Sequence, residues 1–423
     1  MDAIELSWDF ITAQFPEGWR ELAVEMGLIR PQPAQLHTKI RDIEPILRLE
    51  LHRAGLEASL QTTTSTAAAA RKAAEGKGAG QAEGSALIDL APTSLHAWER
   101  KLGPYMAELL ARMVNANDVF SALRWSGYEI VLADGTTVTR PGAKGTTARV
   151  LYAMRLSDMT MLHCLVTDEH GSESLRAFSV RPGELWICDR CYSNPEDIDW
   201  VVRAGGDVLA RHNRGALPLY DARGRRVDVI DLVRSLKTPE EIGEWPVWVH
   251  PAGRDSIAGR LCAVRLHEED AEKARQRLRR EYGGSVSRDL LAAAAWVVVF
   301  TTVPRARMTS QQVLALYRLR WQMELEIKRE KSIGGLSKLP NFLPQTIATW
   351  LYAKLLIHQI ARKIVSPAVA FPPSAIGIAA VTSSSAGARE TAPPRAAGRR
   401  RDVARHGPRS PSHPRRTPPS RAV

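Results

Sequence analysis

The segment that most constrains the fold lies between residues 128 and 211, where apolar residues stop recurring at helical spacing and form short, continuous runs. Three runs follow one another closely and predict a meander of strands. A fourth run, a helical stretch and a fifth run come next, so the segment predicts a mixed α/β sheet. The predicted strands are 128–134, which ends at a turn in 135–138, then 149–156, 161–168, 184–189 and 207–213, with the helix at 195–205.

The remaining residues divide around this segment. Short helical patterns separated by turns predict a helical domain at 1–125, whereas 214–295 has short strand patterns and one helical stretch and reads as a β-rich insertion. A strand at 296–303 and helices at 310–333 and 346–365 return the chain to the core. The predicted domains are thus 1–125, the core parts 126–213 and 296–370, the insertion 214–295 and a tail at 371–423.

Two aspartates stand at the ends of predicted strands. Asp134 ends the apolar run in EIVLAD, and Asp189 ends the run in ELWICD. Strand ends expose side chains to a site while the backbone stays rigid. Either residue alone is more often a turn-former or a helix N-cap. The pair therefore indicates a functional site only if a further carboxylate lies nearby.

The helix predicted at 310–333 supplies a third carboxylate. Steps of 3, 4 and 7 residues bring four polar side chains to one narrow face of a helix, and an apolar stripe one position behind reads as its buried side. A solvated face with salt bridges between turns would explain the same pattern. The polar face has Tyr317, Arg320, Glu324 and Lys331, and the apolar stripe has Leu316, Leu319, Met323 and Ile327.

A cluster of Asp134, Asp189 and Glu324 would suit a metal site. Hard carboxylate oxygens at this density are the ligands of Mg²⁺ or Mn²⁺. Two such ions activate a water or a 3′-hydroxyl and stabilise the leaving oxygen of a phosphodiester. Basic neighbours would then hold a polyanion that the carboxylates alone repel.

The same residues resemble the motifs of bacterial insertion-sequence transposases with a DDE active site. The stretch YRLRWQMELEIKREK contains the four-point signature Tyr-x2-Arg-x3-Glu-x6-Lys without a gap. ADGTTV resembles the first aspartate motif of this group and CDRCYSN the second, in which Cys191 replaces the usual Gly. The long separation between Asp189 and Glu324 suits a core interrupted by an insertion before the glutamate.

The resemblance implies a fold like ribonuclease H and the retroviral integrases, with a DNA-binding helical domain at 1–125. It implies that Asp134, Asp189 and Glu324 bind two Mg²⁺ (or Mn²⁺) ions in each active site. The residues that it implies at the DNA are Tyr317, Arg320, Lys331, Arg211 and Trp296, the last of which would stack on a flipped base. Without a role in DNA binding, Arg211 would be an ordinary surface arginine and Trp296 an ordinary tryptophan of the core.

The resemblance also implies an activity. It predicts a transposase that binds the double-stranded DNA of terminal inverted repeats, cuts it and joins it to target DNA. A homodimer in a synaptic complex is expected, because paired ends need two active sites. Two alternatives stay open: a two-metal DNA nuclease or resolvase of the same fold, which would cleave without strand transfer, and a transposase relic or inhibitor that only binds DNA.

Global charge is weak support for DNA binding. The chain of 423 residues has a formal net charge of +12, but the residues from Ser383 onward contain ten Arg against only Glu390 and Asp402. The tail therefore carries most of the excess, and local basic faces must support the prediction.

The sequence predicts neither export nor membrane insertion. The N-terminus lacks a basic segment followed by an apolar one, and the longest apolar run, 290–300, is too short to cross a bilayer. Four Cys in this length indicate a reducing compartment. Cys188 and Cys191 have a zinc-like spacing, but no second such pair exists, which favours two incidental thiols. A cytoplasmic, nucleoid-associated bacterial protein is expected.

The tail at 371–423 has an unusual composition. After Phe371 there is no aromatic residue and no Lys, only an excess of Pro, Arg, Ser, Ala and Gly, which cannot bury a core. One interpretation is a disordered basic arm that holds DNA. The other, which we favour, is the product of a reading-frame change in a GC-rich gene. A family-like helix encoded in another frame after Phe371 would distinguish the two.

Deleting residues 383–423 is expected to leave the melting temperature unchanged, because this composition buries no apolar surface. Thermal unfolding of the full and shortened chains checks this. A decrease of several degrees on deletion would show that the tail packs against the folded protein.

Overall fold

The computed structural model describes residues 8–30, 40–75, 88, 90–115, 124–282, 286–339 and 344–365, and the predicted tail at 371–423 lies outside them. All the described residues belong to one compact unit, Met1–Val381. The strands are β1 (Glu129–Val138), β2 (Ala148–Arg155), β3 (Met161–Asp168), β4 (Glu184–Cys188), β5 (Asp207–Arg211), β6 (Ile242–Val249), β7 (Ile257–Arg265) and β8 (Trp296–Thr301). The helices are α1 (Trp8–Thr12), α2 (Trp19–Glu25), α3 (Glu44–Leu56), α4 (Leu60–Glu75), α5 (Pro92–Asn115), η1 (Leu175–Ala177), α6 (Pro195–Arg203), α7 (Val229–Val233), α8 (Glu268–Tyr282), α9 (Arg288–Ala293), α10 (Ser310–Arg318), α11 (Trp321–Ser332) and α12 (Pro344–Val365).

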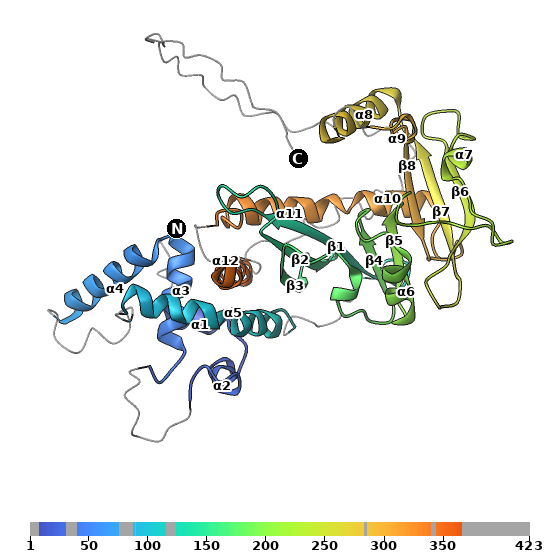
Figure 1. The fold of residues 1–423 in the computed structure, drawn as a ribbon. Helices are drawn as coiled ribbons and strands as arrows, with labels where there is room; N and C mark the ends of the chain where they lie inside the picture. The colour runs from blue at the N-terminus through green and yellow to red at the C-terminus, as the bar shows by residue number, and fades with distance from the viewer. Residues whose placement is uncertain are drawn as a thin grey trace, which may run out of the picture. The chain divides into compact units, whose positions relative to one another are not determined.

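An eight-stranded sheet in the order β3-β2-β1-β4-β5-β8-β7-β6 forms the centre of the unit (Figure 1). β1, β2 and β3 pair antiparallel, as the predicted meander requires. β4 pairs parallel with β1, and β5 pairs parallel with β4. The helix α6 connects β4 to β5, and parallel strands need a crossover of this kind. The predicted mixed α/β sheet is confirmed.

The predicted insertion at 214–295 contributes strands to this same sheet. β8 pairs antiparallel with β5, and β7 and β6 follow beyond it. Residues 220–230, in the segment of short strand patterns, form a turn followed by α7. The carboxylate of Asp221 accepts hydrogen bonds from the backbone N–H groups of Arg223 and Arg225 at 2.9 and 3.0 Å, so the chain reverses before a strand can form.

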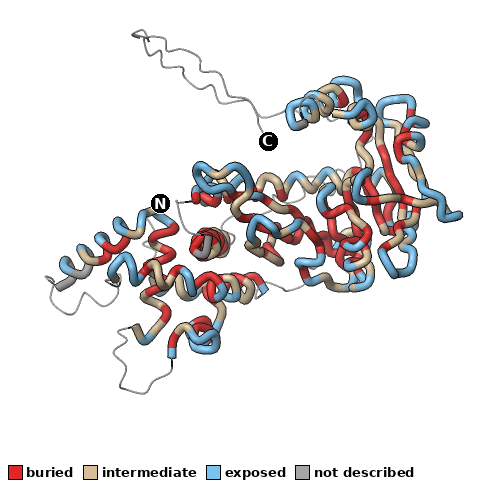
Figure 2. Tube along the Cα trace, viewed as in Figure 1, coloured by how far each residue is buried: buried red, intermediate tan, exposed pale blue. Residues whose placement is uncertain are grey.

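Successive residues of the central strands face opposite sides, which gives the unit two main cores. Ile130 and Leu132 of β1 lie in a core with side chains of α5, α11 and α12, whereas Val131 and Ala133 lie in a core with side chains of α6 and α7. This alternation is the two-residue period of a strand. Figure 2 shows the buried residues along the central strands. Asp134 follows Ile130 and Leu132 at the same two-residue spacing, so its side chain faces α11.

The N-terminal helices share their main core with the sheet. Side chains of α2, α3 and α5 pack in the same core as α12 and the central strands. Thr349 of α12 also donates a hydrogen bond to the backbone carbonyl of Glu99 in α5, at 2.6 Å. The described part of 1–125 contains α1 to α5, and α12 joins it to the sheet. Among the helices that the structure describes, none is long and apolar enough to span a bilayer.

Local capping signals fix two helices that follow core strands. Asn194 precedes α6, and its Oδ1 accepts a hydrogen bond from the N–H of Asp197 at 3.0 Å, with a proline at the first helical position. Thr309 and Gln312 form a capping box at the start of α10. These caps determine where the chain turns after β4 and after β8.

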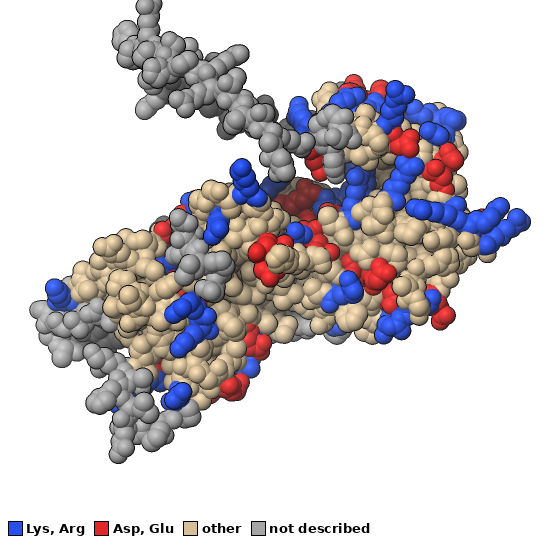
Figure 3. Space-filling model, viewed as in Figure 1, with Lys and Arg blue, Asp and Glu red and all other residues tan. Residues whose placement is uncertain are grey.

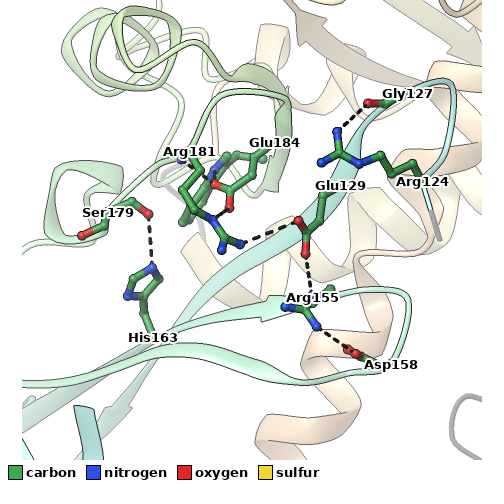
Figure 4. Close-up of polar contacts among 10 residues, drawn as sticks. Arg124, Gly127, Glu129, Arg155, Asp158, His163, Ser179, Arg181 and Glu184 are labelled. Atoms are coloured by element: carbon green, nitrogen blue, oxygen red, sulfur yellow. Dashed lines mark hydrogen bonds and ion pairs between the residues drawn. The ribbon is translucent and has the colours of Figure 1, made fainter. Parts of the chain in front are cut away.

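A buried ion network lies where β1 and β4 begin (Figure 4). Glu129 and Glu184 are partners in the parallel register, and both are buried. Arg155 donates to Glu129 at 2.5 Å, and Arg181 donates to Glu184 at 2.8 Å. Because a buried carboxylate without a partner is costly, these pairs favour a single register of the two strands.

Candidate functional site

The strand register places Asp134 and Asp189 side by side. Leu132 of β1 is the partner of Ile187 of β4. Each aspartate comes two residues after this last pair, and the two lie close enough for the charge of Asp189 to add to the raised pKa of Asp134. β4 ends just before Asp189, as predicted, but β1 continues beyond Asp134 because β2 still pairs with it there. Asp134 is therefore inside a strand, and the prediction that it ends one was wrong.

Arg320 links Glu324 to this pair of aspartates. Its Nη1 lies 3.1 Å from Oδ2 of Asp134, and its Nη2 binds the carboxylate of Glu324. Glu324 lies in the first turn of α11, and Arg320 is the residue before that helix. One guanidinium group therefore connects a strand carboxylate to the helix carboxylate, and all three carboxylates converge on one region.

The long helix predicted for the four-residue signature is two helices. Around Leu319 and Arg320 the backbone N–H groups donate to the carbonyls three residues earlier, which makes a tightened turn between α10 and α11. Tyr317 therefore belongs to α10, whereas Glu324 and Lys331 belong to α11. The predicted apolar stripe lies on the core side, with Leu316, Met323 and Ile327 buried.

The carboxyl group of Asp134 is in an environment that disfavours its charge. Its side chain is only 12% exposed. Burial is the main reason that the pKa of Asp134 rises from 3.8 to about 6, and the charges of Asp189 and Glu173 add to the rise. Arg320 and the N–H of Gly135 oppose it without cancelling it. A bound cation would favour the ionised form again, so the site fits a positively charged ligand.

Glu173 is a fourth carboxylate that sequence reasoning missed. It lies in the connection between β3 and β4, and its side chain is 13% exposed. A carboxylate oxygen of Glu173, one of Asp189 and the sulfur of Cys191 lie within 4.8 Å of one another. The residues around Glu173 have no strand or helix pattern, so no sequence signal singles it out. Oxygen donors dominate the set, which fits a hard divalent cation such as Mg²⁺ or Mn²⁺.

The two cysteines with zinc-like spacing have different environments. Cys188 is buried in the core, and Cys191 is exposed. In the part of the chain that the structure describes, the group of possible metal ligands around Cys191 does not include Cys188. A zinc site with paired thiolates is therefore not supported.

Tyr317 and Arg211 lie close enough to Arg320 to interact with it electrostatically. Burial raises the pKa of Tyr317, and the charges of Arg320 and Arg211 lower it. Burial also lowers the pKa of Arg211, at the end of β5. Lys331 lies seven residues after Glu324, about 10 Å further along the helix, and burial lowers its pKa. The structure thus brings Tyr317 and Arg211 near Arg320 and leaves Lys331 at a distance.

Two tryptophans near the site differ in exposure. Trp296 begins β8 and is 8% exposed, and its indole N–H has no hydrogen-bond partner among the described residues. Its backbone carbonyl accepts a hydrogen bond from Arg211 at 3.5 Å. Trp321, which follows Arg320 directly, is 48% exposed. An exposed indole beside Glu324 is a second feature that the motif pattern did not single out.

The surface around this region combines both signs of charge. Figure 3 shows a hollow between the part of the molecule that carries α11 and the part that carries α8 and α9. Acidic side chains lie inside the hollow, and Lys and Arg side chains lie along its margin. Carboxylates surrounded by basic groups can bind a cation and a polyanion at the same place.

Comparison with known proteins agrees with the resemblance seen in the motifs. The family described as transposase DDE domain matches residues 125–358, which include all three predicted carboxylates. The transposase for insertion sequence element IS421 of Escherichia coli is 30% identical over 290 residues, which cover 64% of this chain and 78% of that protein. The same values hold for the protein InsL of insertion sequence element IS186A of Escherichia coli (strain K12). The transposase for insertion sequence element IS231F of Bacillus thuringiensis subsp. israelensis is 24% identical over 196 residues, 42% of this chain and 41% of that protein. The chain belongs to the transposase DDE domain family.

Proposed function

We propose that this transposase binds the terminal inverted repeats of an insertion sequence, cuts the DNA there and joins the freed ends to target DNA. The observation that carries the proposal is the convergence of Asp134, Asp189 and Glu324 through the register of β1 and β4 and the contact of Arg320. Three carboxylates on two strands and a helix can hold divalent cations against a phosphodiester.

Each residue has a role in this proposal. Asp134, Asp189 and Glu324 would hold two Mg²⁺ or Mn²⁺ ions, which activate the attacking oxygen and stabilise the leaving one when bound. Arg320 holds Asp134 and Glu324 together before the metal binds. With a metal bound to these carboxylates, the guanidinium of Arg320 would be available for a phosphate of the DNA, which it can bind through two N–H groups.

The fold and the assembly are part of the same proposal. The order β3-β2-β1-β4-β5, with three antiparallel strands followed by two parallel ones, supports a core like ribonuclease H. The N-terminal helices of 1–125 would contact the repeats. A homodimer would bring two ends into one synaptic complex, because each active site acts on one end.

Strand transfer separates the proposal from the nuclease alternative. The full chain is incubated with a labelled DNA that carries the element's ends, a supercoiled target plasmid and Mg²⁺. We expect cut ends and, in addition, label joined covalently to the plasmid. Cleaved ends without any joined product would support a nuclease or resolvase, and binding without cleavage would support an inactive relic.

Neutralising Lys331 is expected to weaken end binding and to lower its salt dependence by about one ion, because one phosphate contact is lost. Lys331→Gln is compared with Lys237→Gln, an exposed lysine of the 214–295 segment. Binding constants are measured across a series of salt concentrations. Equal slopes for Lys331→Gln and the parent would remove Lys331 from the DNA interface.

A further inference from the structure

We propose that Glu173 supplies a fourth carboxylate to the divalent-cation site of this transposase and acts jointly with Asp189, an inference that rests on the function proposed above. The three carboxylates of the motifs are enough to suggest a metal site. The environment of Glu173 indicates that the site has one more ligand, which comes from a connection between strands.

The position of Glu173 is defined by its contacts. It precedes Ser174, which caps the short helix η1, so the backbone around it is fixed. Its carboxylate and that of Asp189 lie within 4.8 Å of each other. Two carboxylates at this separation repel each other unless a proton or a cation lies between them. A divalent cation would remove this repulsion and bind both groups.

Gly135 leaves the space that Glu173 occupies. A Cβ atom at position 135 would lie 2.9 Å from Oε1 of Glu173, closer than side chains tolerate. Gly inside a strand weakens it and often marks a close approach by another group. Here the group is a carboxylate, and the strand position is next to Asp134. Because adjacent residues of a strand face opposite sides, the Glu173 carboxylate packs against the face of β1 opposite to Asp134, and its closeness to Asp189 places it beside the candidate site.

Carboxylates outnumber the guanidinium groups that contact them directly. Arg149 of β2 lies 3.2 Å from Oε1 of Glu173, and Arg320 contacts Asp134 and Glu324. These two guanidinium groups contact three carboxylates, and Asp189 adds a fourth carboxylate close to Glu173, so a divalent cation would balance the excess of carboxylates. The buried hydroxyl of Tyr192 supports this arrangement. It has no hydrogen-bond partner in the described part of the chain, and it is near enough to Glu173 and Asp134 for their charges to raise its pKa further after burial. A buried hydroxyl without a protein partner can hydrogen-bond to a ligand bound at the site.

Metal binding without DNA tests the proposal directly. Mn²⁺ binding to the full chain is measured by electron paramagnetic resonance for the parent, Glu173→Gln and the matched control Glu169→Gln, an exposed glutamate in the same connection. We expect Glu173→Gln to weaken Mn²⁺ binding about tenfold or more and Glu169→Gln to leave it unchanged. In cleavage assays, the Mn²⁺ concentration for half-maximal rate should rise by the same factor. Parent-like Mn²⁺ affinity in folded Glu173→Gln would overturn the proposal.

Gly135→Ala gives a second test that leaves Glu173 in place. The added methyl group should displace the Glu173 carboxylate and weaken Mn²⁺ binding to a similar extent. In the double variant with Glu173→Gln the two losses should not add, because they act on one contact. Additive losses, or parent-like binding by Gly135→Ala, would count against the proposal. If the parent binds Mn²⁺ but neither cuts nor joins DNA, the proposed function fails, while the comparison of affinities still decides the role of Glu173.

Discussion

Replacing Asp134 with Asn, Asp189 with Asn or Glu324 with Gln is expected to reduce DNA cleavage about a thousandfold or more. A bound metal ion stabilises the developing charge by several kcal/mol, and each 1.4 kcal/mol changes the rate tenfold. End binding should change by only about twofold, since phosphate contacts depend on other residues. Cleavage of a labelled end in Mg²⁺ and gel-shift binding constants measure the two effects separately.

The isosteric variants should also fold normally. For Asp134 this follows from its raised pKa: its ionised form is disfavoured in the folded state, so losing the charge should not lower stability at neutral pH. Asp255→Asn, at an exposed aspartate between β6 and β7, removes the same charge away from the site and should cleave like the parent. A site variant that keeps near-parent cleavage in Mg²⁺ would remove that residue from the metal site.

The sequence predicted the central part of this site because its signals are local. An aspartate after an apolar run can be recognised from its immediate neighbours, and so can polar residues at helical spacing. The parallel pairing of β1 and β4 then converts two separate signals into adjacent side chains. The end of β1 could not be predicted in the same way. Whether a strand continues past Asp134 depends on β2, which pairs with Asp134 through Tyr152.

Features that depend on distant partners were not predictable. Glu326 and Glu330 look like exposed charges in the α11 sequence, yet both are buried. Their partners come from α12: His358 lies 3.2 Å from Glu326 and 3.4 Å from Glu330, and Arg362 lies 2.7 Å from Glu326. Glu173 is a similar case, because its importance comes from a glycine and an aspartate on other segments. The shared core of the N-terminal helices and the sheet likewise depends on α12.

Trp296→Ala is expected to lower the free energy of unfolding by about 3–5 kcal/mol, the usual cost of removing a buried aromatic side chain. Trp296 is 8% exposed and packs in the core with Phe300 and Leu261. Nicking, second-strand cleavage and strand transfer should therefore decrease together, as the folded fraction decreases. Denaturant unfolding and a labelled-end assay that separates nicked from double-strand products measure these effects. Trp296→Phe should recover part of the stability.

Trp321→Ala is the matched comparison, because Trp321 is 48% exposed and begins the helical turn that carries Glu324. Its removal should change stability by less than about 0.5 kcal/mol, as is usual at the surface. If a flipped base needs an aromatic partner, Trp321 is the indole that is already accessible, and stacking of this kind contributes about 1–3 kcal/mol. Its loss should then leave nicking intact and slow the later attack of the 3′-hydroxyl.

The opposite pattern would assign base stacking to Trp296: unchanged stability and nicking in Trp296→Ala, with second-strand cleavage lost. That result would require the ring of Trp296 to leave its core position when DNA binds.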